Sequence, residues 1–159
     1  MNVPLLPGRI EHWPLARLRP YARNAKTHDA DQVTKIAASM AEFGWTVPCL
    51  VAADGELIAG HGRVLAARQL GLATLPCLRL GHLSEAQKRA YIIADNKLAE
   101  NAGWDNDILS IEYQALYELD LDFDLSLTGF ELPEIDFLIQ QAVKEETFEE
   151  TEGIFKGPD

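Results

Sequence analysis

The apolar residues between positions 29 and 44 recur every three or four residues, the spacing of a helix with one buried face. Asp29 is suited to cap the start of this helix, with Gln32 three residues later at the capping-box position. Gly44 is suited to end it. The predicted buried face consists of Val33, Ile36, Ala37, Met40 and Phe43.

Shorter apolar runs follow and predict a small sheet with one more helix. Residues 13–20 suggest a short extended segment, and residues 47–60 place two apolar runs around the turn-forming triplet Ala-Asp-Gly, which predicts a β-hairpin. Residues 74–80 predict another strand. The helix between hairpin and strand is predicted over residues 63–71, with an apolar side of Val64, Leu65, Ala67 and Leu70.

The rest of the chain is predicted to be helical. Ser84 and Gln87 form a capping-box pattern at the start of a helix that runs to about Ile93 and either bends or continues beyond it. Further helices are predicted over residues 105–120 and 132–143. The first of these is expected to turn Leu109, Ile111, Leu116 and Tyr113 inward. Residues 144–159 are acidic and poor in apolar residues, which predicts a tail or linker.

This order of elements predicts a mixed α+β fold, with a small sheet, surrounding helices and a helical C-terminal extension. The chain of 159 residues is long enough for one domain with a real core. No apolar run approaches the roughly 20 residues needed to span a bilayer, so no membrane contact and a cytoplasmic location are expected. The two cysteines, Cys49 and Cys77, are expected to be buried and reduced, and their spacing does not form a zinc motif.

Charge is distributed unequally along the chain. Residues 1–97 carry 12 Lys and Arg against 8 Asp and Glu, whereas residues 98–159 carry 2 against 17. The front of the chain is therefore suited to an anion, and the rear would repel a phosphate backbone. An acidic rear is also explained by a simple solvated surface, and the charge alone does not decide between the two interpretations.

The loop Gly60-His61-Gly62-Arg63 carries the candidate chemistry. The two glycines let the backbone turn sharply and approach a ligand, and the helix that follows offers unpaired N–H groups at its start. Arg63 adds a planar guanidinium suited to phosphate oxygens. The spacing matches neither a Walker loop nor a dinucleotide fingerprint, so an ordinary tight turn remains an alternative.

Several dispersed motifs give the chain a resemblance to a known family. Residues 37–80, AASMAEFGWTVPCLVAADGELIAGHGRVLAARQLGLATLPCLRL, resemble the N-terminal domain of the ParB family, within the ParB/sulfiredoxin superfamily. Residues 92–101, IIADNKLAEN, resemble the Glu-Asn-x-x-Arg segment of that family. The likeness covers about residues 10–101 and implies the ParB fold with a pocket for CTP or ATP.

The resemblance also implies roles for individual residues. The loop from Gly60 to Arg63 would line the nucleotide phosphates, with Ser39 and Asn24 as further nucleotide contacts. Asn96 and Asp95 would hold Mg²⁺, and Asp95 would replace the glutamate that assists hydrolysis in the family. The residues implied to bind the nucleotide are therefore Asn24, Ser39, Gly60, His61, Gly62 and Arg63.

Departures from the family pattern exclude one activity of the superfamily and weaken the expectation of others. His61 stands where sulfiredoxins have their catalytic cysteine, which excludes repair of sulfinic acids. Gly62 replaces the first arginine of the ParB loop, and the arginine expected after Asn96 is absent, so weaker triphosphate binding is expected and hydrolysis is left open. The helix-turn-helix of a full partition protein is not evident after residue 101, and DNA contact is expected to be weak or indirect.

A narrower likeness points to DNA modification. Residues 23–45, 60–71, 83–105 and 127–139 together look like the ParB-like front domain of phage and prophage DNA methyltransferases. Residues 1–101 would form a nucleotide-binding domain, residues 102–143 a helical extension packed on it, and residues 144–159 the acidic tail. The resemblance implies a regulatory or recognition module for DNA modification or DNA partition in a phage, plasmid or prophage system, which pairs with itself or with a methyltransferase. A nuclease or NTPase, and an interaction domain with a degenerate pocket, are the alternatives.

Overall fold

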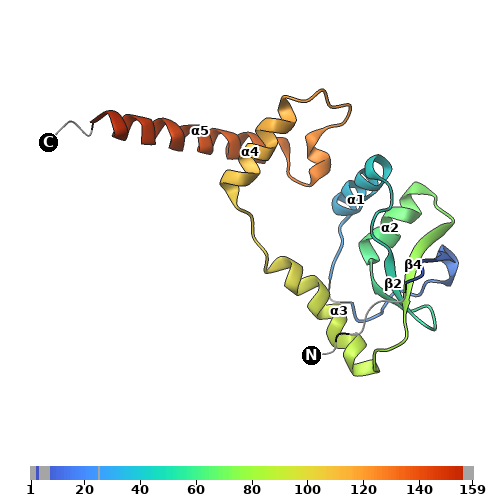
Figure 1. The fold of residues 1–159 in the computed structure, drawn as a ribbon. Coiled ribbons are helices and arrows are strands. Elements are labelled where there is room, and N and C mark those ends of the chain that lie inside the picture. The colour runs from blue at the N-terminus through green and yellow to red at the C-terminus, as the bar shows by residue number, and fades with distance from the viewer. Residues whose placement is uncertain (1–2, 4–7, 25, 156–159) are drawn as a thin grey trace. The chain divides into compact units, whose positions relative to one another are not determined.

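The computed structural model describes residue 3, residues 8–24 and residues 26–155, and it divides the chain into two compact units, 1–102 and 103–159. The first unit is built around a mixed four-stranded sheet (Figure 1). Its elements are β1 (Glu11–Pro14), the 3₁₀ turn η1 (Leu15–Arg17), α1 (Ala30–Phe43), β2 (Cys49–Ala52), β3 (Leu57–Ala59), α2 (His61–Leu70), β4 (Thr74–Leu80) and α3 (Glu85–Glu100).

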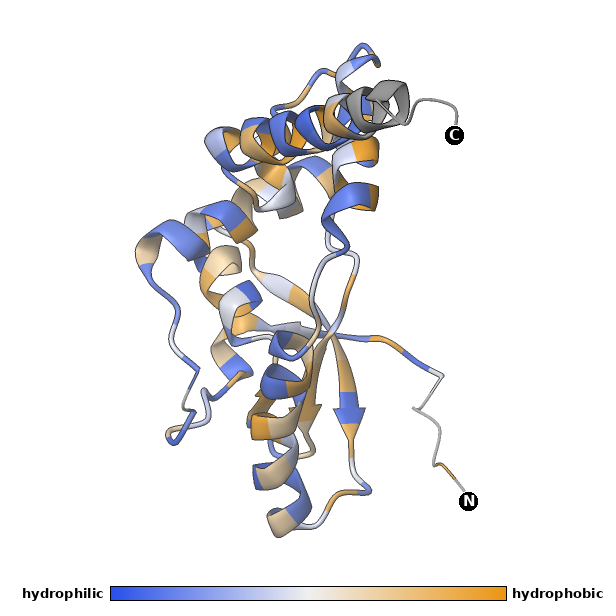
Figure 2. Cartoon of the chain, turned by 90° about the vertical axis from the view of Figure 1, so that its left-hand side faces the viewer, coloured by the Kyte–Doolittle hydropathy of each residue, from blue (hydrophilic) through white to orange (hydrophobic). Residues whose placement is uncertain are grey.

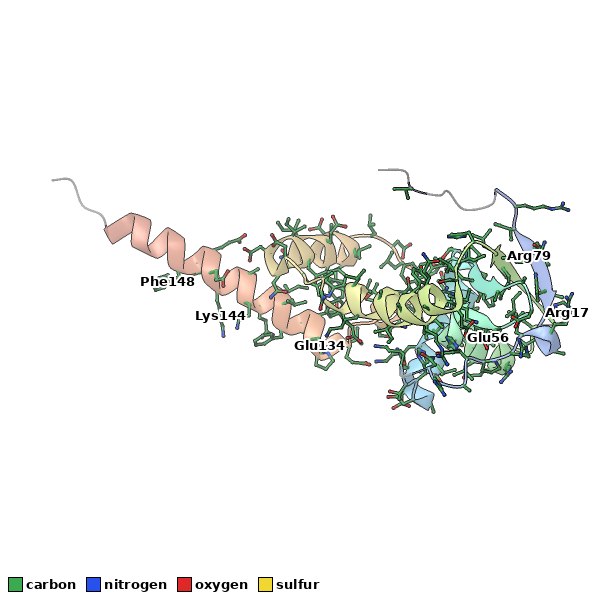
Figure 3. The ribbon with its side chains drawn as sticks, turned by 90° about the horizontal axis from the view of Figure 1, so that it is seen from below. Arg17, Glu56, Arg79, Glu134, Lys144 and Phe148 are labelled. Carbon is green, nitrogen blue, oxygen red and sulfur yellow. The ribbon has the colours of Figure 1, made fainter. Side chains whose placement is uncertain are left out.

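The strand order in the sheet is β1-β4-β2-β3. β2 and β3 form the predicted antiparallel hairpin, and β4 returns parallel to β2 after crossing through α2. This register places Cys49 directly opposite Cys77, and both are buried and free, as the sequence predicted. β1 pairs antiparallel with β4, and Trp13 of β1 enters the core. The Arg17 guanidinium lies 4.5 Å from the centre of the Trp13 ring, and Figure 3 labels Arg17 beside β1.

Local sequence explains where the helices of this unit begin and end. The Asp29 carboxylate accepts a hydrogen bond from the Gln32 amide N–H at 2.7 Å and caps α1, and Gly44 ends α1 with a φ of 84°. Ser84 and Gln87 form the full capping box of α3, and α3 continues without a break to Glu100. The ion pair between Lys88 of α3 and Glu56, at 2.5 Å, ties α3 to the hairpin beside β3.

The buried face of α2 differs from the prediction. Val64 and Ala67 are buried as predicted, but Leu65 and Leu70 are 37% and 40% exposed, and Ala66 lies fully in the core instead. The reason is that α1 packs on α2, so that small residues rather than leucines face the neighbouring helix and the sheet.

The second unit is helical. It contains α4 (Asn106–Tyr117), the 3₁₀ turn η2 (Leu125–Thr128) and α5 (Leu132–Phe155), with a core of Tyr113, Leu125 and Ile135. The Tyr113 hydroxyl lies 2.6 Å from the Thr128 hydroxyl and ties α4 to η2. Figure 2 shows hydrophilic and hydrophobic residues alternating around α5.

Two predictions for this unit need correction. Ile111 was expected to point inward but is 62% exposed, whereas Leu109 and Leu116 pack against the core around Tyr113. The last helix was expected to end at residue 143, but α5 continues to Phe155. Among the described residues, no helix is both long and apolar enough to cross a membrane.

Candidate functional site

The predicted loop forms the junction between β3 and α2. Gly60 precedes the first turn of α2 with a φ of 104°, a left-handed conformation that favours glycine. A Cβ at this position would lie 2.6 Å from the Cys49 Sγ and 3.1 Å from the Arg63 Nη2. No side chain in the described part of the chain caps the start of α2, so the N–H groups of its first turn are left for a ligand.

A cavity of about 150 Å³ lies at this helix start and gathers most of the predicted site. Seven of the eight predicted residues line it, and Ser39 is the exception, because the lining residue from α1 is Ile36. The lining residues are Asn24, Lys26, His28, Ile36, Ala59, Gly60, His61, Gly62, Arg63, Asp95 and Asn96.

Arg63 supplies a fixed positive charge. Its Nη2 donates a hydrogen bond to the Pro48 carbonyl oxygen at 3.2 Å, while its buried Nε has no hydrogen-bond partner among the described residues. A buried donor without a hydrogen-bond partner is energetically costly. Beside it, burial raises the pKa of the Cys49 thiol more than the Arg63 charge lowers it, so the thiol stays protonated.

Gly62 is closely surrounded by side chains. A Cβ on Gly62 would lie 2.9 Å from the Ile36 Cδ1 and 3.1 Å from two ring atoms of His28. Any side chain there would press against α1 and the segment before it. The first arginine of the ParB loop therefore has no room here without rearrangement of Ile36 and His28.

His61 acts as a neutral group rather than a second cation. Burial, with a smaller contribution from the His28 charge, lowers its pKa. Its Nε2 accepts a hydrogen bond from the Tyr21 amide N–H at 3.4 Å, which leaves the proton of the neutral ring on Nδ1. His61 thus connects the segment before α1 to the loop through this hydrogen bond. Its Nδ1–H can donate a hydrogen bond, but the neutral ring adds no positive charge to the cavity.

Lys26 also lines the cavity, and the sequence did not predict it as a site residue. Its amide N–H donates to the Asn24 Oδ1 at 3.3 Å, and its Nζ lies 2.6 Å from the Glu100 Oε1. This pair lowers the pKa of the Glu100 carboxyl. The one local pattern that indicates Lys26 is the Asn-x-Lys spacing. The Asn24 side chain accepts a hydrogen bond from the backbone two residues later, and this turn brings Lys26 to the same cavity as Asn24.

Asp95 and Asn96 reach the cavity from α3. The Asp95 carboxylate is exposed and accepts a hydrogen bond from the Tyr91 hydroxyl at 3.2 Å. The Asn96 Nδ2 donates to the Ile92 carbonyl oxygen at 2.9 Å, which leaves its Oδ1 to accept or coordinate. One carboxylate and one amide oxygen fit a Mg²⁺ that takes its other ligands from phosphate and water. The described residues hold no cluster of three or more His, Cys, Asp or Glu side chains that would bind a metal by themselves.

Two larger cavities adjoin the cavity at the start of α2. They measure about 230 Å³ and 490 Å³, and both share Asn24 and Lys26 with it. The smaller is walled by apolar side chains that include Leu57, Val64 and Leu65. A small polar cavity with larger, mainly apolar space beside it suits a ligand with a charged end and a planar or apolar end.

Comparison with known proteins then gives the family. Residues 6–97, more than half of the chain, match the ParB N-terminal domain family. The chain belongs to the ParB N-terminal domain family. Residues 107–156 match a second family, the ParB-methyltransferase HTH domain. No helix-turn-helix of a full partition protein was evident in the sequence after residue 101, and this match assigns the region to the methyltransferase class instead, with 14 residues between α4 and α5.

Individual relatives agree with this assignment. The chain is 46% identical over 81 residues to the ParB-like nuclease domain-containing protein YnaK of Escherichia coli K12, which covers 51% of this chain and 93% of the relative. It also resembles the C-terminally truncated chromosome-partitioning protein ParB of Caulobacter crescentus complexed with CTP-γ-S, at a TM-score of 0.60 and 23% identity. That match covers 70% of this chain and 64% of the ParB chain.

A second solved structure shows the same fold. The Pnob8-like ParB-N domain aligns at a TM-score of 0.50 and 16% identity, over 66% of this chain and 43% of that chain. At such identities the likeness concerns the backbone. The expected ParB-like α+β fold of the first unit is confirmed.

Proposed function

We propose that the chain is a nucleotide-binding module, taking CTP or ATP with Mg²⁺, that serves a DNA-modification system. The observation that carries the proposal is the convergence of the uncapped α2 start, Arg63 and Lys26 on one cavity. The matched methyltransferase-associated HTH unit and the CTP analogue in a ParB relative support the same assignment.

The arrangement suggests how each group would act. The α2 N–H groups and the Arg63 guanidinium would donate to phosphate oxygens. Asp95 and the Asn96 Oδ1 would hold Mg²⁺ against the same phosphates. Since His61 is neutral, the positive charge at the site comes from Arg63 and Lys26. A loop with an arginine in place of Gly62 would make more phosphate contacts, so this site is expected to make fewer.

Nucleotide binding would regulate association rather than supply chemistry. The ligand touches the segment before α1, the start of α2 and the C-terminal half of α3, which are separate parts of the first unit. A ligand that bridges them stabilises the conformation in which they are close, and so shifts the population of that conformation. We infer that this shift controls pairing of the chain with itself or with a methyltransferase.

Isothermal titration calorimetry with CTP, ATP and GTP in the presence of Mg²⁺ tests the proposal. One nucleotide should bind, and Arg63→Ala should weaken it about 10- to 100-fold, the effect of losing a charge-assisted hydrogen bond. Arg79→Ala is the matched control, because Arg79 pairs with Glu11 outside the cavity and its loss should leave binding unchanged (Figure 3).

The outcomes separate this proposal from the alternatives. No heat with any nucleotide would contradict it and favour an interaction domain with a degenerate pocket. The name of the YnaK relative keeps a nuclease in view. Nicking of supercoiled plasmid in Mg²⁺, abolished by Asp95→Ala, would favour that activity, although a lone carboxylate is poor support for two-metal cleavage.

The ion pair between Lys26 and Glu100 gives a prediction of the opposite sign. The Glu100 carboxylate pairs with the Lys26 ammonium group, which would otherwise contact a phosphate in the cavity. Glu100 therefore competes with the ligand for Lys26. Glu100→Gln should therefore tighten nucleotide binding about two- to fivefold, the scale of an exposed ion pair. The measurement is the same calorimetric titration at low and high salt, and the gain should shrink at high salt.

A control separates local competition from net charge. Glu11→Gln makes the same change in net charge, but Glu11 pairs with Arg79, and neither residue lines any of the three cavities. It should leave nucleotide affinity nearly unchanged. Equal gains from both variants would mean that Glu100 acts only through the overall field.

A further inference from the structure

The second unit carries an open, shallow apolar cavity on its surface. The cavity measures about 380 Å³ and lies between the first turns of α5 and Phe130, which precedes the helix by two residues. Phe130 and Leu138 form its half-buried part, and Phe137 is 60% exposed at its edge. The lining residues are Phe130, Pro133, Glu134, Phe137 and Leu138.

Phe130 is held in place from behind. Its ring packs in T-shaped pairs with the rings of Tyr113 and Trp104, with 6.0 Å and 5.3 Å between the ring centres. Tyr113 is itself fixed by its hydrogen bond to Thr128. The cavity therefore has a preformed base, which lowers the entropic cost of binding an apolar side chain there.

The charge around the cavity restricts what can occupy it. Residues 103–159 contain 16 Asp and Glu against two Lys and no Arg. Glu134 lies in the cavity wall, where its Oε2 accepts a hydrogen bond from the Glu131 amide N–H at 2.8 Å and fixes the carboxylate at the start of α5. An apolar centre with an acidic rim fits a partner with apolar anchors and positive flanks.

We propose that this cavity is a docking site for a basic amphipathic helix of a partner protein. A helix presents apolar anchors every three or four residues, which suits an open apolar cavity of this size, and its Lys and Arg residues would face the acidic rim. Duplex DNA is disfavoured although the unit matches an HTH family, because its phosphates would meet a surface with almost no cations. A second copy of the unit is disfavoured by its identical acidic surface.

A pair of designed peptides tests the site on the full chain. The first is an 18-residue helical peptide of Leu and Lys, with Leu on one face, and the second replaces every Lys with Glu. Fluorescence anisotropy should show saturable binding of the Lys peptide that weakens as salt rises, and no binding of the Glu peptide.

Variants show whether binding uses the cavity. Phe137→Ala should weaken the Lys peptide at least tenfold, as expected for a central aromatic anchor. Glu134→Gln keeps the hydrogen-bond acceptor and should weaken it about threefold. Phe148→Ala is the matched control, since Phe148 is 64% exposed on the same helix but does not line the cavity (Figure 3).

Because Phe137 is exposed, Phe137→Ala should leave the thermal unfolding temperature of the unit unchanged. Thermal unfolding of each variant is measured together with peptide binding. Equal loss from Phe137→Ala and Phe148→Ala would overturn the proposal, because binding would then be nonspecific charge attraction. Binding of a labelled 20-base-pair duplex that Phe137→Ala weakens would overturn it in favour of DNA.

Discussion

Replacing Gly60 with alanine should lower the free energy of unfolding of the first unit by about 2–5 kcal/mol, combining a left-handed backbone with a steric overlap. The backbone φ of 104° is unfavourable for any residue with a Cβ. The added methyl would also lie 2.6 Å from the Cys49 Sγ, which is buried in the sheet and has little room to move. Urea unfolding followed by circular dichroism measures the loss.

Gly71→Ala is the matched control for that experiment. Gly71 ends α2 with a φ of 73°, but nothing lies within 4 Å of a Cβ built there. Its substitution should cost about 1–2 kcal/mol from the backbone alone. The difference between the two variants isolates the contact with Cys49, and equal losses would show that the loop relaxes away from the sheet.

Ile135→Ala should destabilise the second unit by about 2–5 kcal/mol, the range for truncating a fully buried aliphatic side chain. Ile135 is 0% exposed and lies with Tyr113 and Leu125 at the centre of this small core. Since the two units have separate cores, thermal unfolding should show the transition of the second unit move to lower temperature while that of the first stays in place.

Ile111→Ala distinguishes core packing from apolar content. Ile111 is 62% exposed on α4, and its truncation should change stability by less than about 0.5 kcal/mol. A loss as large as that from Ile135→Ala would mean that Ile111 is covered by another part of the protein in solution.

The comparison of these two isoleucines shows where sequence periodicity is sufficient and where it is not. α1, the hairpin, β4 and the start of α3 follow from caps, turn residues and apolar spacing, which act within a few residues. α4 has apolar residues on two faces, so spacing alone could not tell whether Tyr113 or Ile111 faces the core. That choice depends on contacts with α5, which is distant in sequence.

The candidate site shows the same division. The loop at Gly60 and the pair Asp95 and Asn96 were found from motifs and a family resemblance, and the structure brings them to one cavity. Lys26 was missed because its role depends on Glu100, 74 residues away. Ser39 was included by its place in the family pattern, but here its helix presents Ile36 to the cavity instead.

The two buried thiols have a practical consequence for labelling. Burial raises the pKa of the Cys49 thiol, and burial with the nearby Cys49 and Glu11 raises that of Cys77 to about 12. Neither forms appreciable thiolate at neutral pH, and maleimide reagents attack the thiolate. The wild-type protein should therefore not react with a maleimide dye. A single cysteine introduced at an exposed position of α5 would be labelled selectively, without replacing Cys49 or Cys77.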